Sequence, residues 1–207
     1  IAQGSVDSTL SVEIALGGSG ALWMVAGRSF EDVEGALAGF DAGAVVREAE
    51  TYQRDWLQRT ERLGLDGLPD AVADFARHSL MVMRTQVDNG GAVLAANDSD
   101  ILETARAHYS YCWPRDGALV ASVFLRAGYP SLAIRFLRFC AGLLTDQHPY
   151  FLHKYRPDGA LGASWHPWIR GGKAIIPLQA DETGLVISAL AETVEATDET
   201  EFLAETW

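Results

Sequence analysis

The sequence predicts a mainly α-helical protein, and three observations support this fold class. Over most of the 207 residues, apolar side chains recur at helical spacing. Strand-like alternation is found mainly in residues 5–27, around a glycine turn at 17–20, and the short apolar piece at 92–96 is expected to be a strand or an extended loop. In the second half, long polar connections alternate with short turns. In a toroid of helical hairpins, such an alternation gathers the long connections at one end, and that end carries the site.

Six segments are expected to form helices, and local signals mark the limits of several of them. A capping pattern opens at Ser29, Pro69 stands in an early helical position, and Gly128 begins a break. The expected helices cover residues 29–38, 42–63, 68–87, 116–127, 131–144 and 181–195. The expected domains are a β-domain remnant at 1–28, a helical linker at 29–67 and the first part of a helical domain at 68–207.

The strand pattern at the start is expected to be a short β-hairpin. A lone hairpin is only marginally stable in water. Because the chain opens in the middle of the pattern at Ile1, we expect a larger β-domain to precede it.

The composition argues against some classes of partner. The formal net charge is −12, and nucleic acids and anionic membranes both need a basic surface, so neither is expected to bind. No run approaches the roughly 18 apolar residues of a membrane-spanning helix, and the first residues carry no signal-peptide pattern. Cys112 and Cys140 lie in apolar contexts and are expected to be buried free thiols. A reducing cytoplasm is the expected location.

A first block of chemistry-bearing residues lies at 109–118, where a loop leads into a helix. It contains Trp113, Arg115 and Asp116 beside two tyrosines. Aromatic faces stack on the apolar C–H faces of a sugar ring, and an Arg/Asp pair can hydrogen-bond vicinal hydroxyl groups. The alternative is structural: Asp116 would cap or begin the helix, the aromatic residues would belong to the core, and the ion pair would lie on the surface.

A second block at 152–168 and a third at 177–183 have similar chemistry. The second is dense in aromatic and cationic residues that suit a carbohydrate cleft, namely Lys154, Tyr155, Trp165 and Trp168. The alternative to a carbohydrate cleft is a glycine-rich structural loop anchored by the tryptophans. The spacing of the histidines in this block matches no zinc-binding pattern. The third block carries Gln179, Asp181 and Glu182 at a helix start. The two acids are natural first-turn residues, and carboxylates are also the groups that glycoside hydrolysis uses.

Together the three blocks resemble those of the glucoamylase family, glycoside hydrolase family 15, in its bacterial and archaeal branch. The similar stretches read Trp-Pro-Arg-Asp-Gly-Ala at 113–118, Lys-Tyr-Arg-Pro-Asp-Gly at 154–159, Trp-His-Pro-Trp at 165–168 and Gln-Ala-Asp-Glu-Thr at 179–183. The resemblance implies an (α/α)6 toroid, often preceded by a β-sandwich domain. It also implies inverting hydrolysis of α-glucosidic bonds, as in glucoamylases, glucodextranases or trehalases, with no metal or organic cofactor.

The resemblance also implies roles for individual residues. Arg115 and Asp116 match the pair that holds the non-reducing terminal glucose, and Trp113 would support the pocket wall. Trp165 and Trp168 fall in a loop that contributes to the cleft. Gln179 and Asp181 match polar positions of the third block, where Ala180 replaces the usual glutamate.

In the family, the general acid lies beyond the third block, in a Trp-Glu-Glu type block, and the general base lies later still. We therefore expect this chain to supply sugar-binding residues as part of a larger enzyme, completed by the rest of the polypeptide or by a self-associating copy. Glu182 is not assigned as the catalytic acid. The alternatives are a non-catalytic module for carbohydrate binding or protein interaction, and a helical domain whose loops match by coincidence.

Overall fold

The protein is described from a computed structural model, which covers residues 17, 23–25, 27–97, 109–162, 168–198 and 200–206. The chain forms two compact units, residues 1–54 and 55–207. The domain boundaries expected from the sequence after residues 28 and 67 stay predictions. Most of the expected hairpin over 5–27 lies outside the described residues, so the structure does not test it.

The first unit contains helix α1 (Phe30–Ala38) and most of helix α2 (Ala42–Leu57). The predicted capping pattern at Ser29 is confirmed as a capping box. The Ser29 hydroxyl accepts the backbone N–H of Asp32 at 3.1 Å, and the Asp32 carboxylate accepts the backbone N–H of Ser29 at 3.1 Å. Neither helix has a fully buried residue, so α1 depends largely on local interactions such as this capping box for its stability.

The second unit is built mainly from helices, which confirms the predicted mainly α class. Its elements are the 3-10 helix η1 (Gln58–Leu63), α3 (Asp70–Thr85), α4 (Pro114–Arg126), α5 (Pro130–Leu143), strands β1 (Ile169–Arg170) and β2 (Lys173–Ala174), α6 (Ala180–Thr197) and α7 (Thr200–Thr206). The two strands pair antiparallel, with Ile169 opposite Ala174. Gly171 and Gly172 join them with φ angles of 57° and 75°, the left-handed conformation that tight hairpin turns need.

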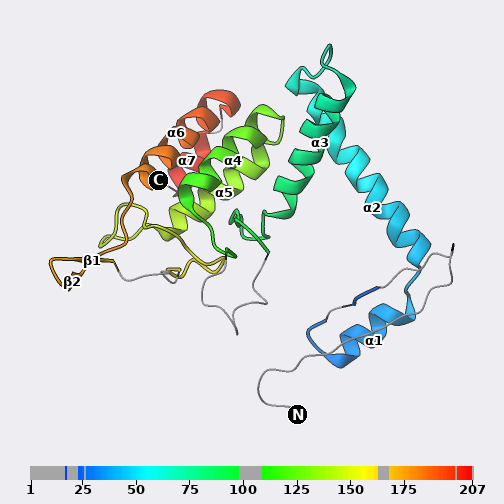
Figure 1. The fold of residues 1–207 in the computed structure, drawn as a ribbon, viewed down its shortest axis with the longest axis horizontal. Helices are drawn as coiled ribbons and strands as arrows, with labels where there is room; N and C mark the ends of the chain where they lie inside the picture. The colour runs from blue at the N-terminus through cyan, green and yellow to red at the C-terminus, as the bar shows by residue number, and fades with distance from the viewer. Residues whose placement is uncertain are drawn as a thin grey trace. The chain divides into compact units, whose positions relative to one another are not determined.

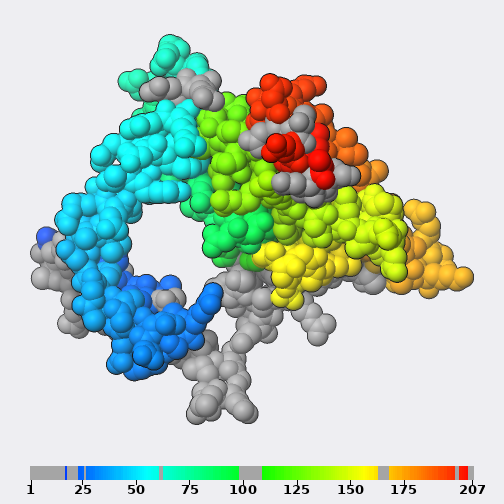
Figure 2. Space-filling view, turned by 180° about the vertical axis from the view of Figure 1, so that it is seen from behind, coloured from blue at the N-terminus to red at the C-terminus, as the bar shows by residue number. Residues whose placement is uncertain are grey.

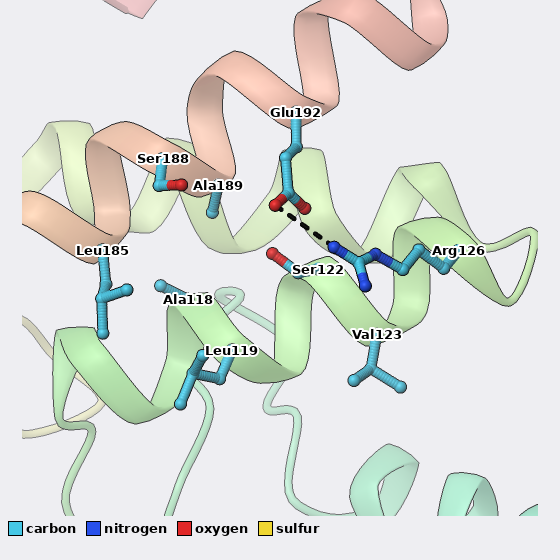
Figure 3. A pocket seen from close by; sticks show the side chains of 9 residues that line it. All are labelled: Ala118, Leu119, Ser122, Val123, Arg126, Leu185, Ser188, Ala189 and Glu192. Carbon is cyan, nitrogen blue, oxygen red and sulfur yellow. Dashed lines mark hydrogen bonds and ion pairs between the residues drawn. The ribbon is translucent and has the colours of Figure 1, made fainter.

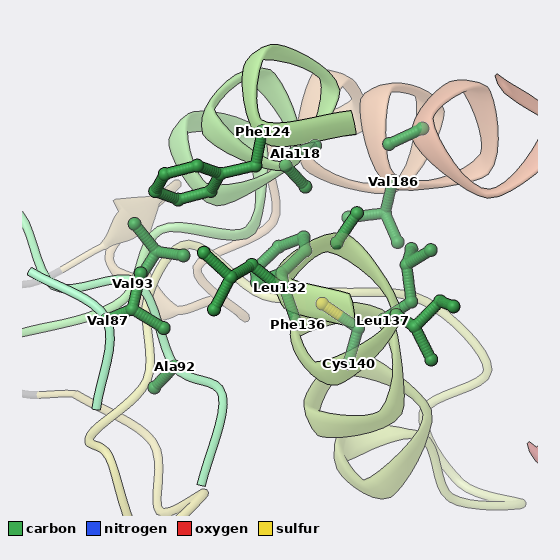
Figure 4. Close-up of a cluster of buried hydrophobic side chains, with 14 of the residues drawn as sticks. Val87, Ala92, Val93, Ala118, Phe124, Leu132, Phe136, Leu137, Cys140 and Val186 are labelled. Atoms are coloured by element: carbon green, nitrogen blue, oxygen red, sulfur yellow. The ribbon is translucent and has the colours of Figure 1, made fainter. Parts of the chain in front are cut away.

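The core of the second unit lies where α4, α5 and α6 pack side by side (Figure 1). Figure 4 shows the buried side chains turned toward one another, from α4 (Ala118, Phe124), α5 (Leu132, Phe136, Leu137, Cys140), α6 (Val186) and the segment that follows α3 (Val87, Ala92, Val93). Phe202 is buried in the same cluster and anchors α7. Figure 2 shows α7, in red, at the surface of this unit.

Tyr129 fixes the start of the second unit against this core. Its ring stacks on Trp56 with centroids 4.1 Å apart, and its hydroxyl donates to the Trp56 carbonyl oxygen. Trp56 therefore acts as a packing residue. The predicted helix over 42–63 is wrong in its last six residues, because regular α-helix ends at Leu57 and a 3-10 helix follows. The Thr60 hydroxyl hydrogen-bonds the Leu57 carbonyl at 2.6 Å and so satisfies one of the carbonyls left at the end of α2.

The remaining helices agree with prediction to within a few residues, and the two cysteines behave as expected. Cys112 and Cys140 are buried free thiols. Burial raises the pKa of Cys112 to about 12, so it stays a thiol at neutral pH. Among the described residues, no helix is both long enough and apolar enough to cross a membrane.

Candidate functional site

The candidate site forms where the first turns of α4 and α6 meet. α4 begins after Trp113 and α6 begins after Gln179, and both preceding residues are extended. The Glu182 carboxylate in the first turn of α6 accepts the backbone N–H of Arg115 in the first turn of α4, with Oε2 and N 2.6 Å apart. The first and third sequence blocks are therefore adjacent in space.

Arg115 is the centre of the site, because its guanidinium contacts every polar side chain singled out in those two blocks. Its Nε lies 3.1 Å from Asp116 Oδ1. Its Nη1 lies 3.1 Å from Gln179 Oε1, 3.2 Å from Asp181 Oδ2 and 3.5 Å from Glu182 Oε1. Three carboxyl groups and one amide thus surround a single cation. Ionised together, the carboxylates would leave the cluster with a surplus of negative charge.

Glu182 supports this cluster from inside the protein. Its side chain is 0% exposed, in contrast to Asp116 and Asp181, whose side chains are 52% and 55% exposed. Burial raises the pKa of Glu182 to about 7, although the Arg115 backbone N–H and guanidinium oppose the rise; Asp116 and Asp181 add to it. Near neutral pH the Glu182 carboxyl group is therefore partly protonated. Its enclosed position suits holding Arg115 rather than contacting a ligand.

The second block joins the site through His153. Its Nδ1 lies 2.9 Å from Gln179 Oε1, and its Nε2 lies 3.3 Å from the indole Nε1 of Trp113. Since the indole N–H can only donate, Nε2 of His153 accepts its hydrogen bond. Nδ1 then carries the ring proton and donates a hydrogen bond to Gln179 Oε1. Burial lowers the pKa of His153, which favours this neutral form. Gln179 Oε1 accordingly accepts from both His153 and Arg115.

Lys154 and Tyr155 lie behind Trp113 inside the protein. Lys154 is 1% exposed, and its Nζ lies 4.5 Å from the ring centroid of Tyr111 and 5.1 Å from that of Trp113. Burial lowers the pKa of this ammonium group. Tyr155 accepts the backbone N–H of Leu152 at its hydroxyl, at 2.8 Å. Both residues face the protein body, where they support the Trp113 ring and the loop.

The structure brings most of the predicted site residues together. Trp113, Arg115, Asp116, Gln179, Asp181 and Glu182 form one connected cluster, and Trp168 contacts it through a tilted ring contact of 5.5 Å with His153. Trp165 lies outside the described residues. His153 was not predicted as a site residue; its place beside Lys154 in the second block was the available signal. Tyr111 was one of the two tyrosines noted in the first block, but it was not predicted as a site residue.

Two hollows adjoin these helices. One of about 200 Å³ lies beside the cluster, between the end of α3 and the start of α4, lined by Met83, Gln86, Val93, Leu94, Ala95, Trp113, Asp116 and Val120. The other, of about 230 Å³, lies between α4 and α6 and is shown in Figure 3. Its far end is bounded by Arg126 and Glu192, whose Nη2 and Oε1 are 3.4 Å apart. The first hollow shares Trp113 and Asp116 with the candidate site.

Chemically, the cluster suits recognition of a neutral polar ligand. It offers carboxylate and amide acceptors, one charged donor group, and aromatic rings nearby. Within the described ranges, no group of three or more His, Cys, Asp or Glu side chains is arranged to hold a metal ion. Comparison of the chain with family models, with curated proteins and with solved structures gave no match.

Proposed function

We propose that the Arg115 cluster binds the terminal glucose unit of an α-glucoside. In this proposal, the chain supplies the substrate-binding residues of an inverting glycoside hydrolase of glucoamylase, glucodextranase or trehalase type, with an (α/α)6 toroid fold. One observation carries it. Gln179 and Asp181, which lie 64 and 66 residues after Arg115 in the sequence, both hydrogen-bond its guanidinium. The polar positions on which the sequence resemblance rests thus meet at one group.

The exposure of the carboxylates fits this role. Asp116 and Asp181 flank Arg115 and are half exposed, so hydroxyl groups of a ligand can reach both acceptors and the guanidinium donors. Hydrogen bonds to charged groups are the strong ones, and a fixed fork of donors gives them direction. Glu182 and Gln179 hold Arg115 in place before any ligand arrives, so little of the binding energy is spent on ordering it.

The cluster is assigned to binding and not to bond cleavage. Inverting hydrolysis needs one carboxylic acid beside the leaving oxygen and a second carboxylate that activates water from the opposite face. Glu182 is enclosed and accepts the Arg115 N–H, and both exposed aspartates are paired with Arg115. The acid and base therefore belong elsewhere in the proposed enzyme, in agreement with the resemblance, which puts them beyond the third block.

Binding can be tested by calorimetry with methyl α-glucoside, maltose, isomaltose and trehalose, against methyl α-galactoside. We expect Arg115→Lys to weaken glucoside binding by tenfold or more, because lysine lacks the planar fork and a charge-assisted hydrogen bond contributes about 1.5–3 kcal/mol. Arg126→Lys is the matched control, since Arg126 lies at the other end of α4 in an exposed ion pair. Equal binding by wild type and Arg115→Lys would contradict the proposal.

A non-catalytic carbohydrate-binding module is the second candidate, and the enclosure of Glu182 favours it. Among the three carboxyl groups around Arg115, that of Glu182 has a pKa raised toward the value that a general acid needs. Its side chain is 0% exposed, so a ligand does not reach it. Proton NMR of maltose separates the two candidates when it is done with the complete polypeptide that contains this chain, because the acid and base are proposed to lie beyond the third block. Release of β-glucose supports the inverting hydrolase, whereas binding without release supports the module.

A further inference from the structure

The hollow beside the Arg115 cluster has mostly apolar walls and two acceptor groups. Met83 and Gln86 line it from the end of α3, and Trp113, Asp116 and Val120 line it from the start of α4. At about 200 Å³ it is smaller than a site for a drug-sized ligand, and its volume suits a single ring or part of one. Asp116 belongs to both the hollow and the Arg115 cluster, so one ligand can occupy both.

Gln86 lines this hollow, and its amide group is only partly hydrogen-bonded. Its Nε2 donates to the Thr85 hydroxyl at 3.2 Å, and that hydroxyl donates to the Val82 carbonyl at 2.7 Å. These two bonds fix which way the amide is turned. Its Oε1 is buried and has no hydrogen-bond partner among the residues that the structure describes. A buried acceptor left in this way is costly, and a hydrogen bond from a bound ligand or water would remove that cost.

The backbone gives Gln86 little freedom to move away. Its carbonyl oxygen accepts the N–H of Leu94 at 2.9 Å, and its N–H donates to the Met83 carbonyl at 3.1 Å. The adjacent Val87 is buried in the core. The backbone of Gln86 is therefore held at the wall of the hollow.

We infer that Gln86 accepts a hydrogen bond from one hydroxyl group of the sugar bound at the Arg115 cluster, and that this bond helps to select the glycoside. The inference rests on the proposed function. A pyranose presents an apolar face and several hydroxyl donors, and the hollow offers an aromatic and aliphatic wall with two oxygen acceptors. A site built to bond a hydroxyl group rejects an analogue that lacks it, because the protein acceptor is then left unpaired.

The test is a cycle between protein variants and ligand analogues. Affinities are measured for methyl α-glucoside and its 2-, 3-, 4- and 6-deoxy analogues, with wild type and with Gln86→Met, which keeps the length of the side chain and removes the acceptor. We expect at least one analogue to bind wild type about fivefold or more weakly than the parent. In Gln86→Met that penalty disappears, while penalties that arise at Arg115 remain.

Two further variants control the experiment. Gln147→Met changes an exposed glutamine in the loop after α5 and should leave every penalty unchanged. Ala95→Leu narrows the hollow from an exposed position and does not depend on the folding of the Gln86 variant; it should weaken binding of the parent and reduce the discrimination. If Gln86→Met and Ala95→Leu distinguish methyl α-glucoside from its deoxy analogues as strongly as wild type does, the inference is overturned. The proposed function is not affected by that result. Absence of any glycoside binding by wild type overturns both.

Discussion

Gly117 offers a sharp test of how α4 is packed beneath the candidate site. It is the fourth residue of α4 and is buried against α5. A Cβ atom at this position would lie 2.3 Å from Cε2 and 2.6 Å from Cζ of Phe136. The ring would have to retreat by roughly 1 Å to reach an ordinary contact distance, and Phe136 is itself fully buried.

Two opposing effects decide the outcome of Gly117→Ala. Alanine favours a helix over glycine by about 1 kcal/mol. Overpacking a filled core costs about 1–3 kcal/mol, and a contact this short belongs at the upper end of that range. We therefore expect a net loss of about 1–2 kcal/mol in the free energy of unfolding, measured by urea titration with far-ultraviolet circular dichroism.

Gly184→Ala is the matched control, because Gly184 lies in the early part of α6 and a Cβ there would meet nothing within 4 Å. This substitution should raise the free energy of unfolding by about 0.5–1 kcal/mol, from helix propensity alone. If Gly117→Ala is as stable as wild type while Gly184→Ala gains stability, the close approach of α4 and α5 described above is wrong.

Two other predictions concern stability. The raised pKa of Glu182, about 7, means that the folded state keeps this proton in a range where the unfolded state, with an ordinary pKa near 4.5, has lost it. The contribution of Glu182 to the free energy of unfolding is therefore greatest below pH 4.5 and falls as the pH rises to 7. Relative to Glu182→Gln, wild type should lose about 3 kcal/mol across that window in urea titrations, and a constant difference would refute the assignment. Ser29→Ala removes one half of the capping box of α1 and should cost that helix about 1 kcal/mol, seen as roughly fivefold faster amide exchange in 30–38; unchanged exchange would show that the cap contributes nothing.

The fold class was predictable because helical periodicity, capping residues and breaks are local features of the sequence. The limits of α5 and α6 came within two residues of prediction, since Pro130 and the acids after Gln179 mark their starts. The end of α2 was not predictable in this way. Apolar spacing continues past Leu57, but the Thr60 hydroxyl binds the Leu57 carbonyl and the chain tightens into a 3-10 helix.

The members of the candidate site were largely predictable, whereas their arrangement was not. Sequence chemistry singled out Arg115, Asp116 and Asp181, but nothing local separates the exposed Asp181 from the enclosed Glu182 next to it. That difference arises only when α6 packs on α4 and one of two adjacent first-turn acids turns inward. His153 was missed for the same reason, because its hydrogen-bond partner Gln179 lies 26 residues further along the sequence.

The inward turn of Glu182 explains why the two helix starts can lie together at all. Each helix N-terminus carries a partial positive charge and unsatisfied N–H groups. α4 has no side-chain cap of its own at Trp113. Glu182 lies in the first turn of α6 and accepts the N–H of Arg115, so one carboxyl group serves both helix ends.

This shared cap also accounts for the position of the Arg115 side chain. A buried carboxylate is costly unless a cation compensates it, and Arg115 Nη1 lies 3.5 Å from Glu182 Oε1. The guanidinium is thereby held at the boundary between the core and the solvent, where Asp116 and Asp181 meet it from outside. A group required for packing two helices is thus also the group that the proposed ligand would meet. Substitutions at Glu182 should therefore weaken sugar binding through Arg115, without any contact between Glu182 and the sugar.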